Sequence, residues 1–338
     1  MSRRFGRGLV IGKLSPLHRG HELLLNAALE RCERVYCVSY SNPELPGCEA
    51  ATRRRWMAEL FPAVEHLALD ATREHLPHNS GSELEHRRFV AQICLKRLGT
   101  TVDVVFTSEH YGDGFAAQLQ QDFQAAGHAG ATVEHVLVDL ARRAVPISAS
   151  QLRQERALHR EFLSPVVRAS FVRRVCVLGG ESSGKTTLAR ALAQAFETTH
   201  VEEYGRQLWV ERDGSLGYSD YLTIARTQIE HEDRAARGAN DLLFCDTSPL
   251  TTLLYCLDQF GHAEPELYEL AARPYDVTLL CAPDFPFVQD GTRRDEAFRT
   301  RQHAFYLSEL ASRQTPFLLV EGSLEARVAL GRRHLERQ

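Results

Sequence analysis

The chain has 338 residues, of which 43% are hydrophobic and 25% are charged, and its formal net charge is -4 at pH 7. This length exceeds the roughly 100–200 residues of a typical domain, and the composition excludes disordered and fibrous proteins, so we expect two globular domains. The mildly acidic charge argues against binding of nucleic acid through a broad basic surface, and no direct DNA binding is expected.

Membrane and secretion signals are also missing from the sequence. No apolar run approaches the roughly 20 residues that a membrane-spanning helix needs, and no secretion signal precedes the first apolar run. The eight cysteines are scattered without a C-x-x-C pair. We therefore expect reduced, mostly buried thiols in a cytoplasmic protein that does not enter a membrane.

Short apolar runs alternate with longer helical patterns along the chain. The runs are "GLVIGKL", "RVYCVSY", "VEHLALD", "DVVFTSE" and "TVEHVLVD" in the first half, and "RRVCVLGG", "DLLFCD", "DVTLLCA" and "PFLLVEG" in the second. This alternation predicts an α/β fold class with two doubly wound parallel sheets. Residues 154–171 interrupt the pattern, so we place the boundary near residues 168–173, with domains 1–168 and 169–338.

The first apolar run leads into "SPLHRGH" at the start of a helical pattern. His18 and His21 flank this turn, so both can point at phosphates bound to the helix N-terminus, and Gly20 permits a close approach. Two surface histidines without a ligand are the alternative, which the flanking strand and helix disfavour. We interpret this segment as a phosphate site.

A second piece of the same site follows the last strand of the first domain. In "ISASQLR", Ser148 can cap a new helix whose free N–H groups, together with Arg153, would bind the same triphosphate. Such a site supports adenylyl transfer without a covalent intermediate, because positioning and charge stabilisation do the catalysis.

The strongest motif is "GGESSGKT", which satisfies G-x-x-x-x-G-K-[ST] between the strand "RRVCVL" and a helical pattern. Its N–H groups would bind phosphates, Lys185 would reach the β and γ oxygens, and the Thr186 hydroxyl would bind Mg²⁺. The ATP-binding residues predicted here are Gly179, Gly180, Glu181, Ser182, Ser183, Gly184, Lys185, Thr186 and Thr187.

Two later features favour a kinase of small molecules over a nucleotide-dependent switch. Asp246 ends the run "DLLFCD", where a carboxylate can orient Mg²⁺ or accept a proton; a cap for the next helix is the alternative. Residues 286–299, "PFVQDGTRRDEAFR", carry Arg293 as a mobile lid would, although an exposed loop is the alternative. Lid arginines stabilise charge on a transferred phosphoryl group.

The order of these motifs resembles the bifunctional nicotinamide-mononucleotide adenylyltransferase/ribosylnicotinamide kinases of the NadR type. The resemblance extends from "GKLSPLHRGH" through "ISASQLR", "GGESSGKTT", "EEYGRQ", "YSDY" and "DTSPLTT" to "FVQDGTR". It implies that a C-terminal P-loop kinase domain phosphorylates nicotinamide riboside. An N-terminal H-x-G-H nucleotidyltransferase domain, which is Rossmann-like, then joins the product NMN to AMP and gives NAD.

The resemblance also implies roles for individual residues. His18 and His21 would polarise ATP phosphates, and Lys185, Asp246 and Arg293 would serve phosphoryl transfer, with Thr186 and Asp246 on the metal. ATP bound in the first domain would contact Gly12, Lys13, His18, His21, Ser148 and Arg153. The substrates would contact Arg53, Trp56, Glu203, Tyr204, Arg206 and Asp290.

A further expectation concerns the nicotinamide ring in the first domain. The family stretch matching residues 77–86 carries tryptophan, whereas "PHNSGSELEH" has no aromatic residue. The segment "TSEHYGDGF" offers Tyr111 to stack on the ring and Asp113 to favour its charge or bind ribose hydroxyls. The alternative is that Tyr111 only covers the following helix.

The expected ligands are ATP as a substrate, Mg²⁺, nicotinamide riboside, NMN and NAD. A helix-turn-helix repressor domain, which some members of the family carry, is not expected, because eleven residues precede Gly12. Three alternatives stay open at this point: a different phosphorylated acceptor in the first domain, a protein that senses ATP or NAD, and assembly as a homo-oligomer.

Overall fold

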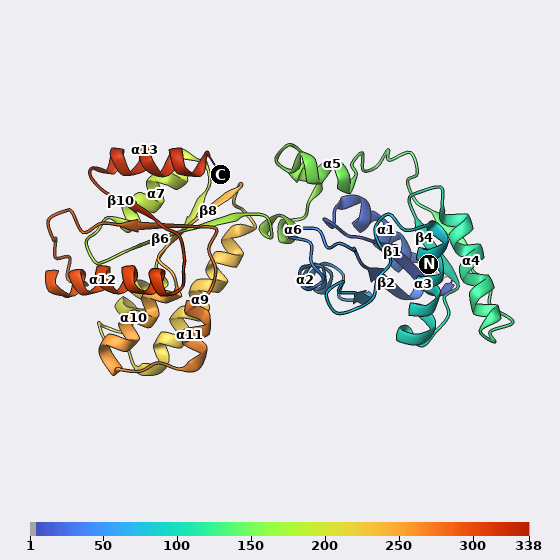
Figure 1. Ribbon diagram of the computed structural model, residues 1–338, viewed down its shortest axis with the longest axis horizontal. Coiled ribbons are helices and arrows are strands. Elements are labelled where there is room, and N and C mark those ends of the chain that lie inside the picture. Colours follow the sequence, from blue (N-terminus) through green and yellow to red (C-terminus); the bar gives the residue numbers. More distant parts are fainter. Residues whose placement is uncertain (1–4, 338) are drawn as a thin grey trace. The chain divides into compact units, whose positions relative to one another are not determined.

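We analysed a computed structural model of the chain, which describes residues 5–337. The chain divides into two compact units, Met1–Ser170 and Phe171–Gln338. Each unit contains one five-stranded sheet, and every strand pair in both sheets is parallel. Helices connect the strands, so the predicted fold class, two doubly wound α/β sheets, is confirmed (Figure 1).

The first unit has the strand order β3-β2-β1-β4-β5. Its strands are β1 (Phe5–Gly12), β2 (Cys32–Ser39), β3 (Glu65–Ala68), β4 (Val104–Thr107) and β5 (Glu134–Leu137). Its α-helices are α1 (Arg19–Arg31), α2 (Ala50–Leu60), α3 (Glu83–Ile93), α4 (Gly112–Ala125), α5 (Ala149–Gln154) and α6 (Pro165–Ala169). A π-helical turn, Cys94–Leu98, extends α3, and two 3-10 turns, Arg156–Leu158 and Arg160–Phe162, precede α6.

The second unit has the strand order β10-β9-β6-β8-β7. Its strands are β6 (Arg173–Gly179), β7 (Thr199–Val201), β8 (Leu242–Asp246), β9 (Val277–Cys281) and β10 (Leu318–Val320). Its helices are α7 (Lys185–Ala195), α8 (Tyr204–Glu211), α9 (Tyr218–Ala236), α10 (Pro249–Phe260), α11 (Pro265–Ala271), α12 (Glu296–Ser312) and α13 (Leu324–Leu335).

Alternating side chains of the central strands build a core on each face of the second sheet. Val175 and Val177 of β6 pack with α7 and α13, whereas Cys176 and Leu178 pack with α9, α10, α11 and α12. Figure 1 shows these helices on opposite sides of the sheet. Helices cover both faces of this sheet. The place that remains for a ligand is therefore the edge formed by the carboxyl ends of the strands, at the point where the strand order reverses.

Two details differ from the sequence prediction. The strand β7 has three residues and was not predicted, since so short a run carries no periodic signal. The first strand ends at Gly12 rather than Leu14, because Leu14 has a φ of 48° and leaves the extended conformation.

All eight cysteines are buried and free, as predicted. Within residues 5–337, no helix combines the length and the hydrophobicity that crossing a bilayer requires.

Candidate active sites

The phosphate-binding loop of the second unit connects β6 to α7. Gly179 has a φ of 151°, and a Cβ placed on it would lie 2.5 Å from Ser183 Oγ, so only glycine fits. Gly184 caps α7 in the left-handed conformation. Lys185 Nζ donates a hydrogen bond to the carbonyl of Gly180 at 3.0 Å. The loop therefore presents N–H groups, a helix N-terminus and one ammonium group to a single point, as a polyphosphate site requires.

Thr186 and Asp246 meet beside this loop. The Thr186 hydroxyl donates to Asp246 Oδ2 at 2.5 Å, and Asp246 Oδ1 is buried without a hydrogen-bond partner among the described residues. An orphaned carboxylate oxygen at the carboxyl end of β8, next to a hydroxyl in the first turn of α7, is a donor set that suits Mg²⁺. The residues present thus fit the predicted metal, which Thr186 and Asp246 would hold.

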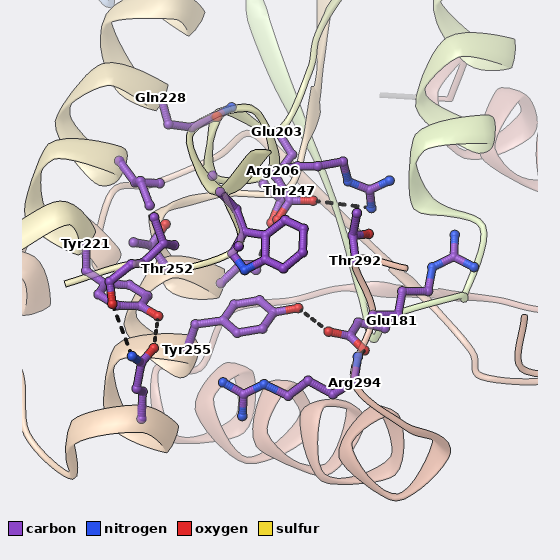
Figure 2. A pocket seen from close by; sticks show the side chains of 18 of the residues that line it. Glu181, Glu203, Arg206, Tyr221, Gln228, Thr247, Thr252, Tyr255, Thr292 and Arg294 are labelled. Atoms are coloured by element: carbon purple, nitrogen blue, oxygen red, sulfur yellow. Dashed lines mark hydrogen bonds and ion pairs between the residues drawn. The ribbon is translucent and has the colours of Figure 1, made fainter. Parts of the chain in front are cut away.

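A cavity of about 360 Å³ lies next to the phosphate loop, and Figure 2 shows it from close by. Helices α8, α9 and α10, the phosphate loop and the segment 286–294 supply its lining. We call residues 286–294 the lid. The charged and aromatic side chains of the lining belong to Glu181, Lys185, Glu203, Arg206, Trp209, Tyr221, Tyr255, Arg293 and Arg294. The cavity is large enough for a small organic ligand.

Glu203 caps α8 at the end of β7 and lines the cavity. Burial raises the pKa of its carboxyl, and Asp246 adds to this effect, whereas the Lys185 charge opposes it. Arg206 lies 4.0 Å from Glu203 and 3.9 Å from Asp290 of the lid. These predicted residues therefore come together, with a basic carboxylate close to the phosphate loop.

The lid contacts the phosphate loop through residues that were predicted to bind ATP. Glu181 Oε1 accepts from the Tyr255 hydroxyl at 2.8 Å, and its Oε2 accepts from the Arg294 N–H at 2.7 Å (Figure 2). Arg293 pairs with Asp290 at 3.1 Å and lines the cavity. The Glu181 side chain thus faces the lid and not the phosphate position.

Two of the predicted substrate residues of this unit, Tyr204 and Asp290, do not line the cavity. The Tyr204 ring packs edge-on against His231, with ring centroids 5.4 Å apart, and Tyr204 is not among the residues that line the cavity. Thr187 lies on the exposed side of α7. The helix α8 turns the Tyr204 ring toward α9, and the substrate role of this side chain stays a prediction.

Sequence reasoning missed the aromatic part of this site. Trp209 and Tyr255 line the cavity, and they come from α8 and α10, far apart in the chain. Trp209 is held in place by the next turn, because a Cβ on Gly214, which has a φ of 83°, would lie 3.0 Å from its Cζ2 atom. Neither residue belongs to a phosphate motif. The one sequence signal for Trp209 is the helical period of α8, which places Trp209 on the same side of the helix as part of "EYGR".

In the first unit, His18 and His21 form the cap of α1. His18 Nδ1 accepts from the Gly20 N–H at 3.1 Å, and His21 Nδ1 accepts from the His18 N–H at 3.3 Å. Burial lowers the pKa of His18 to about 4 and the pKa of His21 well below 6.5. Both rings are therefore neutral at pH 7, and since each Nδ1 accepts, each proton is on Nε2. The His21 Nε2 atom faces Gly12 at the end of β1.

The predicted second piece joins this cap. The Ser148 hydroxyl accepts from the Gln151 N–H and caps α5, as the sequence suggested. Arg153 donates to the carbonyl of Ser15 at 2.6 Å, although 138 positions separate the two residues. Burial, and then the Arg153 charge, lower the pKa of Lys13. Lys13 and Arg153 are thus close enough to share one anionic ligand.

Arg53 and Trp56 are buried within the first unit. The Arg53 guanidinium is fully buried and donates to Glu44, to the carbonyls of Cys48 and Leu69 and to Ser39. The Trp56 indole, also buried, donates to the Ser170 hydroxyl at 2.8 Å. These donors hold α2 against the strand ends and against Ser170 at the end of α6, and the substrate contact of the pair stays a prediction.

Tyr111 and Asp113 lie at the start of α4. Tyr111 packs on the core of the first unit, and burial raises its pKa to about 12. Asp113 pairs with His135 at 2.8 Å, and His135 also contacts the Thr107 hydroxyl at 2.8 Å. Another aromatic residue, Tyr40, lies beside α3, where its hydroxyl contacts His86 at 2.8 Å. Tyr111 thus has the packing role that we gave as the alternative, and its stacking role stays a prediction.

The chain is similar to known proteins in sequence. A family model described as "AAA domain" matches residues 174–327. The "Trifunctional NAD biosynthesis/regulator protein NadR" of Escherichia coli (strain K12) is 30% identical over 312 residues, which cover 85% of this chain and 71% of that protein. The protein of the same name from Salmonella typhimurium (strain LT2) is 31% identical over 304 residues, with the same two coverages.

Two solved structures share the fold. "Crystal structure of NadR protein in complex with NAD and AMP-PNP" is similar with a TM-score of 0.69 and 21% identity, over 99% of this chain and 97% of that one. "Crystal structure of NadR protein in complex with NR" gives a TM-score of 0.66 and 21% identity, over 95% and 91%. Since the curated relatives reach 30% identity over most of both sequences, the chain belongs to the NadR family.

Proposed function

We propose that the protein makes NAD in two steps. The unit Phe171–Gln338 transfers a phosphoryl group from ATP to nicotinamide riboside, and the unit Met1–Ser170 transfers an adenylyl group from ATP to the product NMN. The observation that carries this proposal is the cavity beside the phosphate loop, which combines aromatic rings with a basic carboxylate. The names of the curated relatives and the NAD, AMP-PNP and NR complexes of NadR support the same substrates.

The lining of the cavity suits a riboside with a cationic ring. Trp209 and Tyr255 offer aromatic faces to a pyridinium. Cation–π contacts of this kind contribute about 0.5–2 kcal/mol each. Tyr221 and Arg206 also line the cavity and supply a hydroxyl and a guanidinium, which are groups that bind ribose hydroxyls.

Phosphoryl transfer follows from the position of Glu203. The 5′-hydroxyl of the riboside forms a bond to the γ-phosphorus of ATP, the bond from the γ-phosphorus to the bridging oxygen breaks, and ADP leaves. Glu203 accepts the hydroxyl proton, for which its raised pKa is suited. Lys185 and Arg293 stabilise the charge on the transferred group. Mg²⁺, held by Thr186 and Asp246, would neutralise charge on the β and γ oxygens.

Adenylyl transfer in the first unit uses neutral donors. A phosphate oxygen of NMN attacks the α-phosphorus of ATP, and the bond to the β-phosphate breaks, so that NAD and pyrophosphate form. The Nε2–H groups of His18 and His21 donate to phosphate oxygens without adding charge. Lys13 and Arg153 stabilise the pyrophosphate that leaves. Tyr111 and Asp113 are the proposed contacts of the NMN ring.

Product analysis tests the proposal. The purified chain is incubated with Mg-ATP and nicotinamide riboside, and the products are separated by chromatography over time. NMN should appear first and NAD second, with one ADP and one pyrophosphate released per NAD. NMN without NAD, even when NMN is added in excess, would restrict the proposal to the kinase unit. Hydrolysis of ATP that does not depend on the riboside would favour a sensing role instead.

A further inference from the structure

The carboxylate of Glu181 is an unexpected group inside a phosphate-binding loop. A negative side chain next to a bound triphosphate is repelled by it unless the side chain turns away. Glu181 does turn away, and it is buried between Tyr255 and the lid. Its two oxygens accept from two different elements, the Tyr255 hydroxyl of α10 and the Arg294 N–H at the end of the lid.

The next residue holds the other end of the lid. Ser182 Oγ accepts from the Val288 N–H at 3.0 Å. Ser182 has a φ of 56°, which is a costly conformation for a residue with a side chain. Adjacent residues of the phosphate loop therefore bind backbone N–H groups near both ends of the lid, so the conformation of the loop and the position of the lid depend on each other.

The same residues are tied to the riboside cavity. Tyr255 lines the cavity, and its hydroxyl is fixed by Glu181. The Arg294 guanidinium lies 4.3 Å from the centre of the Phe298 ring and pairs with Asp258 of α10. The Glu181 N–H donates to Gln302 of α12 at 2.7 Å. Glu181 is thus the residue at which the phosphate loop, the lid and the aromatic wall of the cavity meet.

We propose that Glu181 is a positioning residue that couples ATP binding to closure of the lid over the riboside, with Ser182 as its partner. Phosphates bound by the loop favour the loop conformation seen here. In this conformation the side chains of Glu181 and Ser182 accept hydrogen bonds from the lid, and Glu181 also accepts one from Tyr255. By linkage, each substrate then raises the affinity of the other by the same factor. This inference rests on the proposed kinase function and adds a contact that is made neither to phosphate nor to riboside.

The test measures the dissociation constant of nicotinamide riboside with and without saturating Mg-AMP-PNP. The full chain has two tryptophans, of which Trp209 lines the cavity and Trp56 is buried in the other unit, so quenching of tryptophan fluorescence reports binding. In the unmodified protein, AMP-PNP should tighten riboside binding on the order of 10-fold. In Glu181→Ala this ratio should fall to about 1–2-fold, while AMP-PNP alone still binds.

Three further variants separate the contacts that Glu181 and Ser182 make to the lid from a general structural effect. Glu181→Gln should keep most of the coupling, because its amide oxygen can accept from the Arg294 N–H and its amide group can donate to the Tyr255 hydroxyl. Ser182→Ala, a smaller change, should reduce the coupling several-fold. Glu230→Ala is the matched control, because Glu230 is an exposed carboxylate on α9, and it should behave as the unmodified protein.

The outcomes distinguish this inference from the function on which it rests. A protein that binds no riboside in any form would overturn the proposed kinase function and the inference with it. Riboside binding that AMP-PNP tightens equally in the unmodified protein, Glu181→Ala and Ser182→Ala would overturn the inference alone. Binding that AMP-PNP does not affect in the unmodified protein would also overturn it.

Discussion

Replacement of Glu203 by glutamine is the sharpest probe of the kinase site. The amide has the shape of the carboxylate but cannot accept the proton of the riboside hydroxyl. Glu203 is half-buried, and burial raises the pKa of its carboxyl, an effect that the Lys185 charge opposes and Asp246 adds to. A positioned general base contributes about 10²–10⁴-fold in rate. We therefore expect kcat for NMN formation to fall by that factor, or about 2.7–5.4 kcal/mol in activation free energy.

The pH dependence gives this prediction a second readout. The base acts when ionised, and its pKa in the folded protein lies above the usual 4.5. The kinase rate of the unmodified protein should therefore fall as the pH is lowered through that raised pKa, and Glu203→Gln should lack this limb. The assay follows ADP release at saturating riboside as the pH is lowered from neutral toward the usual carboxyl pKa of 4.5. A variant within fivefold of the parent rate, with the same acidic limb, would refute the assignment.

Three other expectations concern binding, stability and pH. Trp209→Ala should raise the riboside KM by about 5–150-fold, which is the effect of one lost stacking partner, while the ATP KM changes little. Equal changes in both constants would contradict the proposal that Trp209 stacks on the riboside. Arg53→Ala should lower stability by about 3–5 kcal/mol, because it leaves Glu44 without its buried partner; a raised NMN KM with unchanged unfolding in urea would restore its substrate role. The adenylyltransferase rate should show no histidine-like inflection near pH 6.5, since burial lowers the pKa of His18 to about 4 and that of His21 well below 6.5; an inflection there would mean that a charged imidazole takes part.

The sequence predicted the parts of each site that lie next to one another in the chain. The P-loop, the H-x-G-H turn and the Ser148 cap are set by local hydrogen bonds and by glycine conformations, so a few consecutive residues specify them. Both fold class and strand positions followed from the same short-range patterns, apart from the three-residue β7.

What could not be predicted depends on which way a side chain turns within its element. Arg53 was assigned to a substrate because it is basic, yet α2 turns it inward onto Glu44. Tyr204 and Trp209 are five positions apart on α8, and only the second reaches the cavity. Glu181 was grouped with the phosphate ligands because of its place in the motif, whereas the structure directs it to the lid.

The central claim is that two separate ATP sites act in sequence, and one paired measurement tests it most directly. Lys185→Ala and His21→Ala are each assayed with riboside and, separately, with added NMN. Lys185→Ala should form no NMN from riboside and should still convert added NMN to NAD at close to the parent rate. His21→Ala should accumulate NMN and lose about 10²–10³-fold in NAD formation. Equal loss of both activities in either variant would contradict the two-site account.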